Sequence, residues 1–374
     1  MKTGTLKYAL LSLAAALPAL VLSACSKEEI VQTAEGAPIE FGVKTVAAQT
    51  RTEIADNDNI AGKTIYVYGA TSSTDWIYSA EPIAYSNTAK KWYPTDSKSI
   101  KSWNRSLTYQ FYGFTYMPAG SDRITFPTVW DNKLQKHVIS GYHKTFTIKQ
   151  PDSYDKRDEM VDFLLSHTFN ALGSARPIVQ LQLEHAMALV DIYIVKHSSL
   201  GGRTVRVKSM TLTNVRTEAT MTCTRQAIAG AGDTNDWQTN FIDHTPATYS
   251  TTEPLAVATE AKSTEAHMRI VAVPQQLDST IKLTVVYEVD ESADGEGGNK
   301  QMVEHSETFS LYNYTPMVWE SGHRIIYRAT IDTGIHLQGQ IAAWKDVDYI
   351  EGTVLPDIPD NPSDEESDDK EEIL

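Results

Sequence analysis

A thiol at position 25 is the side chain whose surroundings most directly predict a covalent reaction. Cys25 follows two small residues, Ser23 and Ala24, and these follow an apolar stretch over residues 8–22. Such an order is typical of a secretory leader with a small-residue cleavage site. The ten histidines form no His-Glu-x-x-His pair, and the chain has no Gly-x-Ser-x-Gly elbow and no phosphate-binding Walker loop. We therefore predict no catalytic residue, no metal site and no enzymatic activity.

The first 24 residues are predicted to be a signal peptide. Their apolar stretch is shorter than the ~20 residues that a membrane-spanning helix needs, and it contains Pro18. The tetrad Leu22-Ser23-Ala24-Cys25 resembles the bacterial lipobox. The resemblance implies cleavage between Ala24 and Cys25, a diacylglycerol on the thiol, and no other cofactor. Several acyl chains on one residue hold a protein firmly on a bilayer.

A short charged spacer, Ser26-Lys27-Glu28-Glu29, follows the predicted lipid anchor. It is similar to the acidic export tag of surface lipoproteins in Bacteroidetes, which implies a surface-exposed place on the cell outer membrane. An ordinary solvated linker is the alternative, because four residues are a weak signal.

Weaker candidates for chemistry have structural explanations. His185 stands beside Ala186 without a second ligand at metal spacing, and we interpret it as a structural histidine. Cys223 has no intramolecular partner if Cys25 is acylated, and we expect it to be a small residue on a strand. The oxygen-rich stretches 56–59 and 290–298 lack the ligand spacing of an EF-hand, so polar turns are favoured over calcium loops.

Aromatic side chains are concentrated in residues 76–116, with Trp76, Trp92 and Trp103 among them. Aromatic residues of a β-sandwich mostly belong to the core, because each buries a large area. Rings that stay exposed would suit a sugar or an adhesive surface, so these three tryptophans are the candidate ligand residues.

Composition and charge narrow the class of protein. Hydrophobic residues make up 41% and charged residues 22%, which are globular values. A formal net charge of −15 argues against a nucleic-acid partner. Much of that charge lies in residues 357–374, where nine acidic residues accompany one lysine. This acidic tail is predicted to be disordered, because it cannot bury enough apolar surface.

Alternation of apolar and polar residues predicts short strands along most of the chain. In residues 281–289 every odd position is apolar or aromatic, so one face of this strand is buried. Helical spacing is scarce, and only residues 162–171 suit one or two turns. Strands without intervening helices favour all-β, antiparallel sandwiches. We divide the chain into a signal peptide (1–24), a lipidated linker (25–38), two β-sandwich domains (39–176 and 177–356) and the tail (357–374).

Three segments resemble the Bacteroidetes fimbrillin superfamily, the lipoprotein precursors of type V pili and their relatives. The first is Ile39-Glu-Phe-Gly-Val followed by Thr50-Arg-Thr52, similar to the family's opening strand and its processing loop. The second is the apolar, alternating stretch 183–195, similar to the strand that opens the second domain. The third is 322–331 followed by 340–345, similar to the family's ending with a tryptophan.

This resemblance implies two transthyretin-like β-sandwich domains. Arg51 matches the arginine after which a trypsin-like protease removes the leader and the first strand. The open groove then takes a strand from another subunit, so fimbrial subunits and surface glycans or proteins are the implied partners. Residues 347–354 alone offer some alternation near the end of the chain, which leaves open a stalk, tip, anchor or non-polymerising role.

Two other functions fit the sequence less well. A non-polymerising, glycan-binding surface lipoprotein would use the aromatic stretch. A surface hydrolase would need two carboxylates facing one cleft, and acidic residues are abundant throughout the chain.

Overall fold

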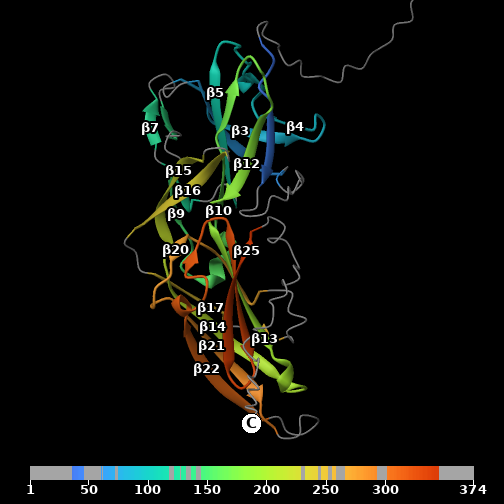
Figure 1. Ribbon diagram of the computed structural model, residues 1–374, viewed down its shortest axis with the longest axis vertical. Coiled ribbons are helices and arrows are strands. Elements are labelled where there is room, and N and C mark those ends of the chain that lie inside the picture. Colours follow the sequence, from blue (N-terminus) through green and yellow to red (C-terminus); the bar gives the residue numbers. More distant parts are fainter. Residues whose placement is uncertain are drawn as a thin grey trace, which may run out of the picture.

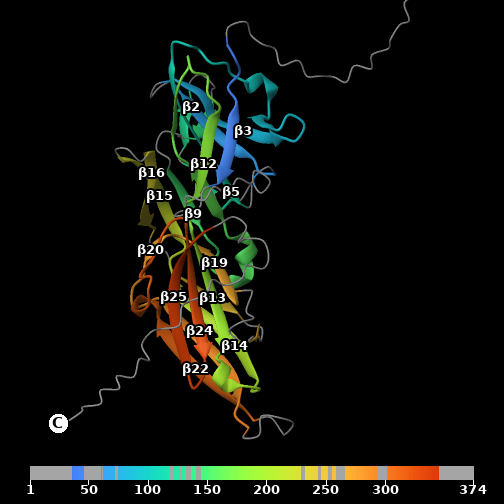
Figure 2. The ribbon, with the colours of Figure 1, turned by 45° about the vertical axis from the view of Figure 1, so that its right-hand side comes forward.

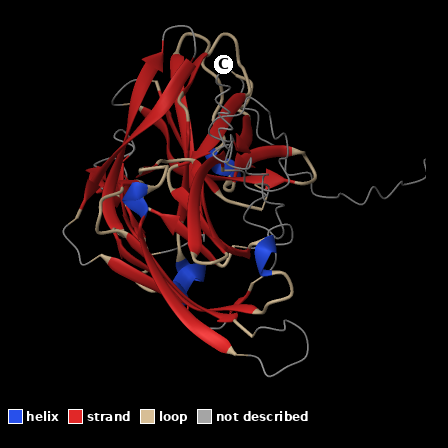
Figure 3. Cartoon of the chain, turned by 60° about the horizontal axis from the view of Figure 1, so that its bottom comes forward, coloured by secondary structure: helices blue, strands red, loops and turns tan. Residues whose placement is uncertain are grey.

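Strands dominate the part of the chain that the structure describes (Figures 1 and 3). A computed structural model describes residues 36–45, 60, 62–71, 75–117, 122–126, 128–131, 136–139, 145–228, 232–242, 246–251, 255–257, 266–292 and 301–344. The helices in this part are short 3-10 turns: η1 (Ser97–Ser99), η3 (Tyr154–Glu159), η4 (Ser198–Leu200) and η6 (Leu311–Asn313). The all-β expectation is confirmed. Within the same residues, no helix is long and apolar enough to cross a membrane.

The first half of the chain forms an eight-stranded sheet in the order β10-β12-β1-β4-β3-β2-β5-β11. Because β10 also pairs with β5, the sheet closes on itself around its own core. Its strands are β1 (Phe41–Thr45), β2 (Ile65–Ala70), β3 (Trp76–Ser86), β4 (Lys91–Pro94), β5 (Thr108–Met117), β10 (Asp162–Ser166), β11 (Phe169–Leu172) and β12 (Val179–His185).

The second half is a sandwich of two sheets whose inner residues share one buried cluster. One sheet has the order β19-β13-β24-β25, and the other has the order β17-β14-β21-β22, with β18 beside β14. The strands are β13 (Ala188–Lys196), β14 (Val205–Val215), β17 (Ala247–Thr251), β18 (Leu255–Ala256), β19 (Met268–Ala272), β21 (Lys282–Asp290), β22 (Met302–Ser310), β24 (His323–Ile331) and β25 (Ile335–Ala343). In Figures 1 and 2 this sandwich and the first sheet occupy opposite ends of the long axis.

A four-stranded sheet between these ends joins both halves of the chain, in the order β16-β15-β9-β6. It consists of β6 (Ile124–Thr125), β9 (Thr145–Lys149), β15 (Glu218–Ile228) and β16 (Gly232–Phe241). Two small pairs complete the fold: β7 (Thr128–Asp131) with β8 (Lys136–Ile139), and β20 (Gln275–Gln276) with β23 (Val318–Trp319).

The pairing of strands refines two sequence-based expectations. The stretch 183–195 is two strands rather than one, because β12 belongs to the first sheet and β13 to the second sandwich. The chain changes sheets at Ala186 and Met187. Residues 162–171 form β10 and β11 and no helix. Every residue of β10 is buried, which explains why its pattern shows no strand-like alternation.

The change of sheets is fixed by a buried cluster of three side chains. Nδ1 of His185 lies 2.7 Å from Oδ2 of Asp162, and the exposed fractions of these residues are 5% and 2%. The imidazole stacks on the indole of Trp344, with 3.9 Å between ring centroids and 9° between ring planes. Trp344 follows β25, so the end of the second sandwich packs against the end of β12. His185 is therefore a paired structural residue, as the sequence predicts.

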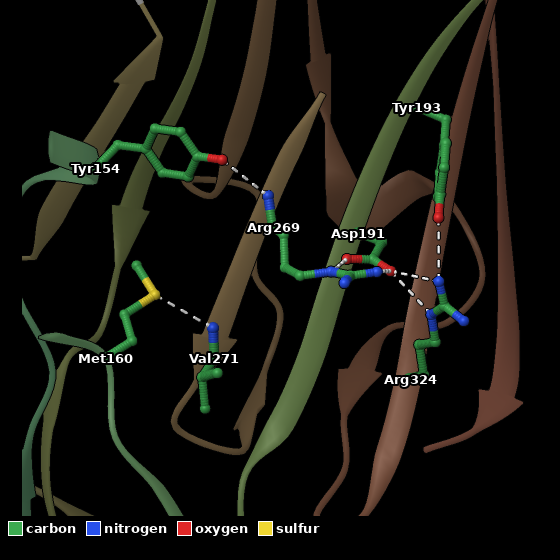
Figure 4. A network of polar contacts seen from close by, with 7 residues as sticks. All are labelled: Tyr154, Met160, Asp191, Tyr193, Arg269, Val271 and Arg324. Carbon is green, nitrogen blue, oxygen red and sulfur yellow. Dashed lines mark hydrogen bonds and ion pairs between the residues drawn. The ribbon is translucent and has the colours of Figure 1, made fainter. Parts of the chain in front are cut away.

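A buried ion network crosslinks the β19-β13-β24-β25 sheet of the second sandwich (Figure 4). Asp191 on β13 is fully buried and accepts hydrogen bonds from Nε of Arg269 at 2.7 Å and Nε of Arg324 at 2.8 Å. Arg324 also donates to the hydroxyl of Tyr193 at 3.0 Å. The backbone amide of Arg269 donates to the hydroxyl of Tyr154 on η3 at 3.1 Å. One carboxylate thus holds β13 to both neighbours, β19 and β24.

Candidate functional site

The candidate functional site is the position of β1 in the first sheet, between β12 and β4. Ile39, Phe41 and Val43 are at most 3% exposed and point into the core, while Glu40 and Gly42 alternate with them and are half-buried on the outer face. This alternation is the one that the sequence predicts for residues 39–46. It makes β1 a structural part of the first core.

The hydrogen bonds of β1 are unequal on its two sides. On one side it runs parallel to β12 in a register of five residue pairs, from Phe41 opposite Val179 to Thr45 opposite Leu183. On the other side only Phe41 pairs with β4, opposite Trp92. A parallel pairing is an exception in this fold, since the described pairings other than β1–β12 and β13–β24 are antiparallel. Alternation alone does not reveal strand direction, so the sequence did not predict it.

The side chain of Phe41 anchors β1 in a cluster of aromatic rings. Its ring lies edge-on to Tyr78 at 5.6 Å and to Phe111 at 6.1 Å between centroids. The amide of Ile39 donates to the carbonyl of Lys101 at 2.8 Å, and the amide of Trp103 donates to the carbonyl of Ala37 at 2.9 Å. Removing β1 would leave an apolar slot, together with unpaired backbone groups on β12.

A groove of about 390 Å³ lies on the outer face of the sheet along β1. Its lining comes from β1, β3, β4 and β12, from the residues just before β1 and β12, and from the turn before β4: Glu40, Phe41, Gly42, Val43, Lys44, Tyr85, Lys90, Lys91, Trp92, Ile178 and Gln180. Nζ of Lys91 lies 2.7 Å from Oε1 of Glu40, and this hydrogen bond raises the pKa of the Lys91 amine. The turn residue Lys90 has φ of 55°, a left-handed conformation that is uncommon outside glycine.

The residues predicted for anchoring and processing, Ala24, Cys25 and Arg51, lie outside the described residues. The described part of β1 ends at Thr45, on the N-terminal side of Arg51. Their roles remain predictions.

The tryptophans proposed as ligand residues do not form an exposed surface. Trp92 and Trp103 are each 2% exposed and belong to the core of the first sheet. Trp103 packs edge-on against Tyr109 at 4.9 Å between centroids. Trp76 is half-buried against Tyr68 at 5.7 Å. The expectation of flat, exposed rings is wrong for Trp92 and Trp103, because both rings fill the space enclosed by the closed sheet.

The remaining candidates have structural roles where they are described. Cys223 is buried on β15. Asp290 accepts hydrogen bonds from the amide and hydroxyl of Ser292, at 3.1 and 2.7 Å, which is the behaviour of a turn residue. Residues 293–298 and 56–59 lie outside the described residues. No group of three or more metal-ligating side chains occurs among the residues that the structure describes.

Sequence reasoning missed the lysines of the groove. Lys44, Lys90 and Lys91 come from two segments that β1 and β4 bring together, and a single charged residue on an alternating strand is not distinctive. The pair Lys90-Lys91 at a hairpin turn was the only signal in the sequence.

The chain is similar in fold to solved structures of other proteins. A fimbrial protein from Bacteroides vulgatus is 14% identical, with a TM-score of 0.50, and the match covers 82% of this chain and 99% of that one. A protein assigned to cell adhesion from Bacteroides uniformis is 13% identical, with a TM-score of 0.48 and coverage of 82% and 99%. No curated protein sequence matches this chain significantly. The sequence model of the fimbrillin-like family matches residues 47–344, so the chain belongs to the fimbrillin-like family.

Proposed function

We propose that this protein is a surface-anchored subunit of a fimbria, structural or adhesive, and that it assembles when β1 is removed and replaced by a strand of another subunit. The observation that supports this proposal is the pairing of β1. This strand has an apolar inner face, and it forms five residue pairs with β12 on one side and a single pair with β4 on the other. The similar fold of the fimbrial protein from Bacteroides vulgatus agrees with this proposal. The proposed role is structural or adhesive, without catalysis.

Membrane attachment in this proposal depends on Cys25. Replacing Cys25 by alanine is expected to abolish incorporation of radioactive palmitate and to release the protein from the outer-membrane fraction, because one thiol carries the whole anchor. Cys223→Ala is the matched control, since it removes the other cysteine and leaves the leader intact. Palmitate labelling of the Cys25→Ala protein would overturn the assignment as a lipoprotein.

Processing in this proposal depends on Arg51. Treatment of the full chain with a trypsin-like protease is expected to yield a product that begins at Thr52, and Arg51→Ala is expected to block that cut. Loss of β1 leaves backbone groups of β12 unpaired beside an apolar slot, which favours pairing with another molecule. Size-exclusion chromatography and negative-stain microscopy should then show oligomers for the wild type.

Arg105→Ala is the control for this cut, because Arg105 is an exposed turn residue far from β1 in the sequence. It should leave both processing and assembly unchanged. A wild-type protein that loses β1 and remains monomeric would contradict the proposal of strand exchange.

A non-polymerising glycan-binding lipoprotein is the second candidate function. Burial of Trp92 and Trp103 removes the main feature that supported it. Assembly after loss of β1 separates the two functions, because the second candidate does not polymerise, and a glycan array with the full chain then tests that candidate for a ligand.

A further inference from the structure

The groove along β1 carries positive charge on a strongly acidic protein. Its lining residues include three lysines and one glutamate, whereas the whole chain has a formal net charge of −15. Lys91 is exposed on β4 and lies 2.7 Å from Glu40, and Lys90 is exposed in the turn beside it. An excess of ammonium groups in one hollow favours a ligand that carries several carboxylates.

Apolar and aromatic side chains also line the groove. Gly42 is one of its lining residues, and a Cβ atom there would lie 2.6 Å from Oε1 of Gln180, so glycine leaves the room that this side chain occupies. Ile178 is 47% exposed at one end, and Tyr85 is half-buried against Trp92. A volume of about 390 Å³ suits a few residues of an extended peptide.

The chain itself contains a segment of matching charge. Residues 357–374 include nine acidic residues and one lysine, with Ile358, Ile373 and Leu374 as apolar members. No other stretch of this length in the sequence is as acidic. The negative charge of the segment therefore complements the lysines of the groove. Its apolar residues suit the apolar side chains that also line the groove.

The segment 357–374 can reach the groove of its own molecule, because the described chain ends close enough to β12. Trp344 stacks on His185 at one end of β12, and Gln180 lies toward the other end, ~17 Å away at ~3.3 Å per residue. Residues 345–356 can span up to ~40 Å. Acidic residues from position 357 onward can thus reach Lys44, Lys90 and Lys91 without a second copy.

We propose that the acidic segment 357–374 binds intramolecularly in the lysine groove along β1. Individual exposed ion pairs are weak, but tethering gives the segment an effective concentration in the millimolar range, so several weak contacts suffice. Since Gly42 and Lys44 belong to β1 and Glu40 directly precedes it, the contact requires β1 in place. This inference does not depend on cleavage at Arg51, because it concerns the uncut chain.

The test is zero-length coupling of carboxylates to amines with a carbodiimide, mapped by mass spectrometry on the full chain. Crosslinks from residues 357–374 are expected mainly at Lys44, Lys90 and Lys91, and they should weaken between ~0.05 and ~0.5 M salt. The Glu40–Lys91 pair is a built-in positive control that reports whether coupling works. Mixing isotope-labelled and unlabelled protein shows whether the crosslinked residues belong to one molecule.

Variants make the test specific. The triple change Lys44→Gln, Lys90→Gln and Lys91→Gln should lower total coupling of the segment to the body about tenfold, as expected for the loss of three weak ion-pair contacts. The matched triple change Lys63→Gln, Lys98→Gln and Lys282→Gln removes equal charge from exposed lysines outside the groove, and it should change coupling less than about twofold.

Three results would overturn the proposal: crosslinks spread over all exposed lysines, crosslinks formed only between labelled and unlabelled copies, or equal losses in both triple variants. Isothermal titration with an oligogalacturonate tests a glycan occupant of the groove. Binding that is equally strong with and without residues 357–374 would assign the groove to an acidic sugar and refute the intramolecular contact.

Discussion

Replacing Asp191 by alanine is expected to lower the free energy of unfolding by about 3–5 kcal/mol, the cost of breaking a buried ion pair from one side. Asp191 is fully buried, and Arg324 is only 4% exposed. Without the carboxylate, the guanidinium of Arg324 keeps the Tyr193 hydroxyl as its neighbour but loses its nearest negative charge. The midpoint of urea unfolding, followed by tryptophan fluorescence, measures the effect.

Asp158→Ala provides the matched control, because Asp158 is exposed on η3. A surface change of this kind should alter stability by less than about 0.5 kcal/mol. Arg324→Met, which removes one of the two guanidinium groups, should fall between the two variants. If Asp191→Ala were as stable as Asp158→Ala, the network in Figure 4 would not stabilise the second sandwich.

Replacing Phe41 by alanine is expected to cost about 3–5 kcal/mol, the usual loss when a buried phenylalanine is truncated. Phe41 is 3% exposed and contacts Tyr78 and Phe111 through its ring. The loss weakens the attachment of β1 as well as the first core. Urea unfolding measures the global effect, and hydrogen exchange of peptides that cover residues 36–45 measures release of the strand.

Glu40→Ala is the neighbouring control, since Glu40 lies on the outer face of β1 and makes an exposed pair with Lys91. Its expected cost is below about 1 kcal/mol. Equal exchange rates in the two variants would mean that backbone pairing with β12, rather than the Phe41 ring, holds β1 in place.

Strands with one buried and one solvent-exposed face could be predicted from the sequence. Residues 281–289 alternate in type, and β21 alternates in burial over nearly the same residues. The pattern failed where both faces are covered: β10 is buried at every position, so its apolar residues gave a spacing that was mistaken for a helix. Such short apolar runs do not distinguish strand from helix.

Contacts between distant segments were beyond prediction for a different reason. Asp191 lies in an apolar strand, and its partners Arg269 and Arg324 are 78 and 133 residues away. A single sequence shows that a carboxylate stands in a buried strand, which requires a partner. It does not show which of the many arginines supplies the charge.

The aromatic stretch illustrates how residue type differs from exposure. A tryptophan suits both a core and a sugar-binding surface, and the sequence provided no way to choose for Trp92 and Trp103. Closure of the first sheet determines that both rings are buried, because the pairing of β10 with β5 encloses them. The strand that closes the sheet, β10, is far from both tryptophans in the sequence.

The parallel register between β1 and β12 has a consequence for symmetry. A strand that replaced β1 on β12 in the proposed assembly would come from a different surface of the donating copy than the slot it enters. Contacts between unlike surfaces are heterologous, and unless their rotation closes a ring they generate an open filament. Reciprocal exchange between two copies related by a two-fold axis is the smallest such ring and fills both slots, so a fimbria requires a rotation that does not close. In the proposed fimbria, one end would therefore always present an empty acceptor and the other an unused donor, so growth would have a direction.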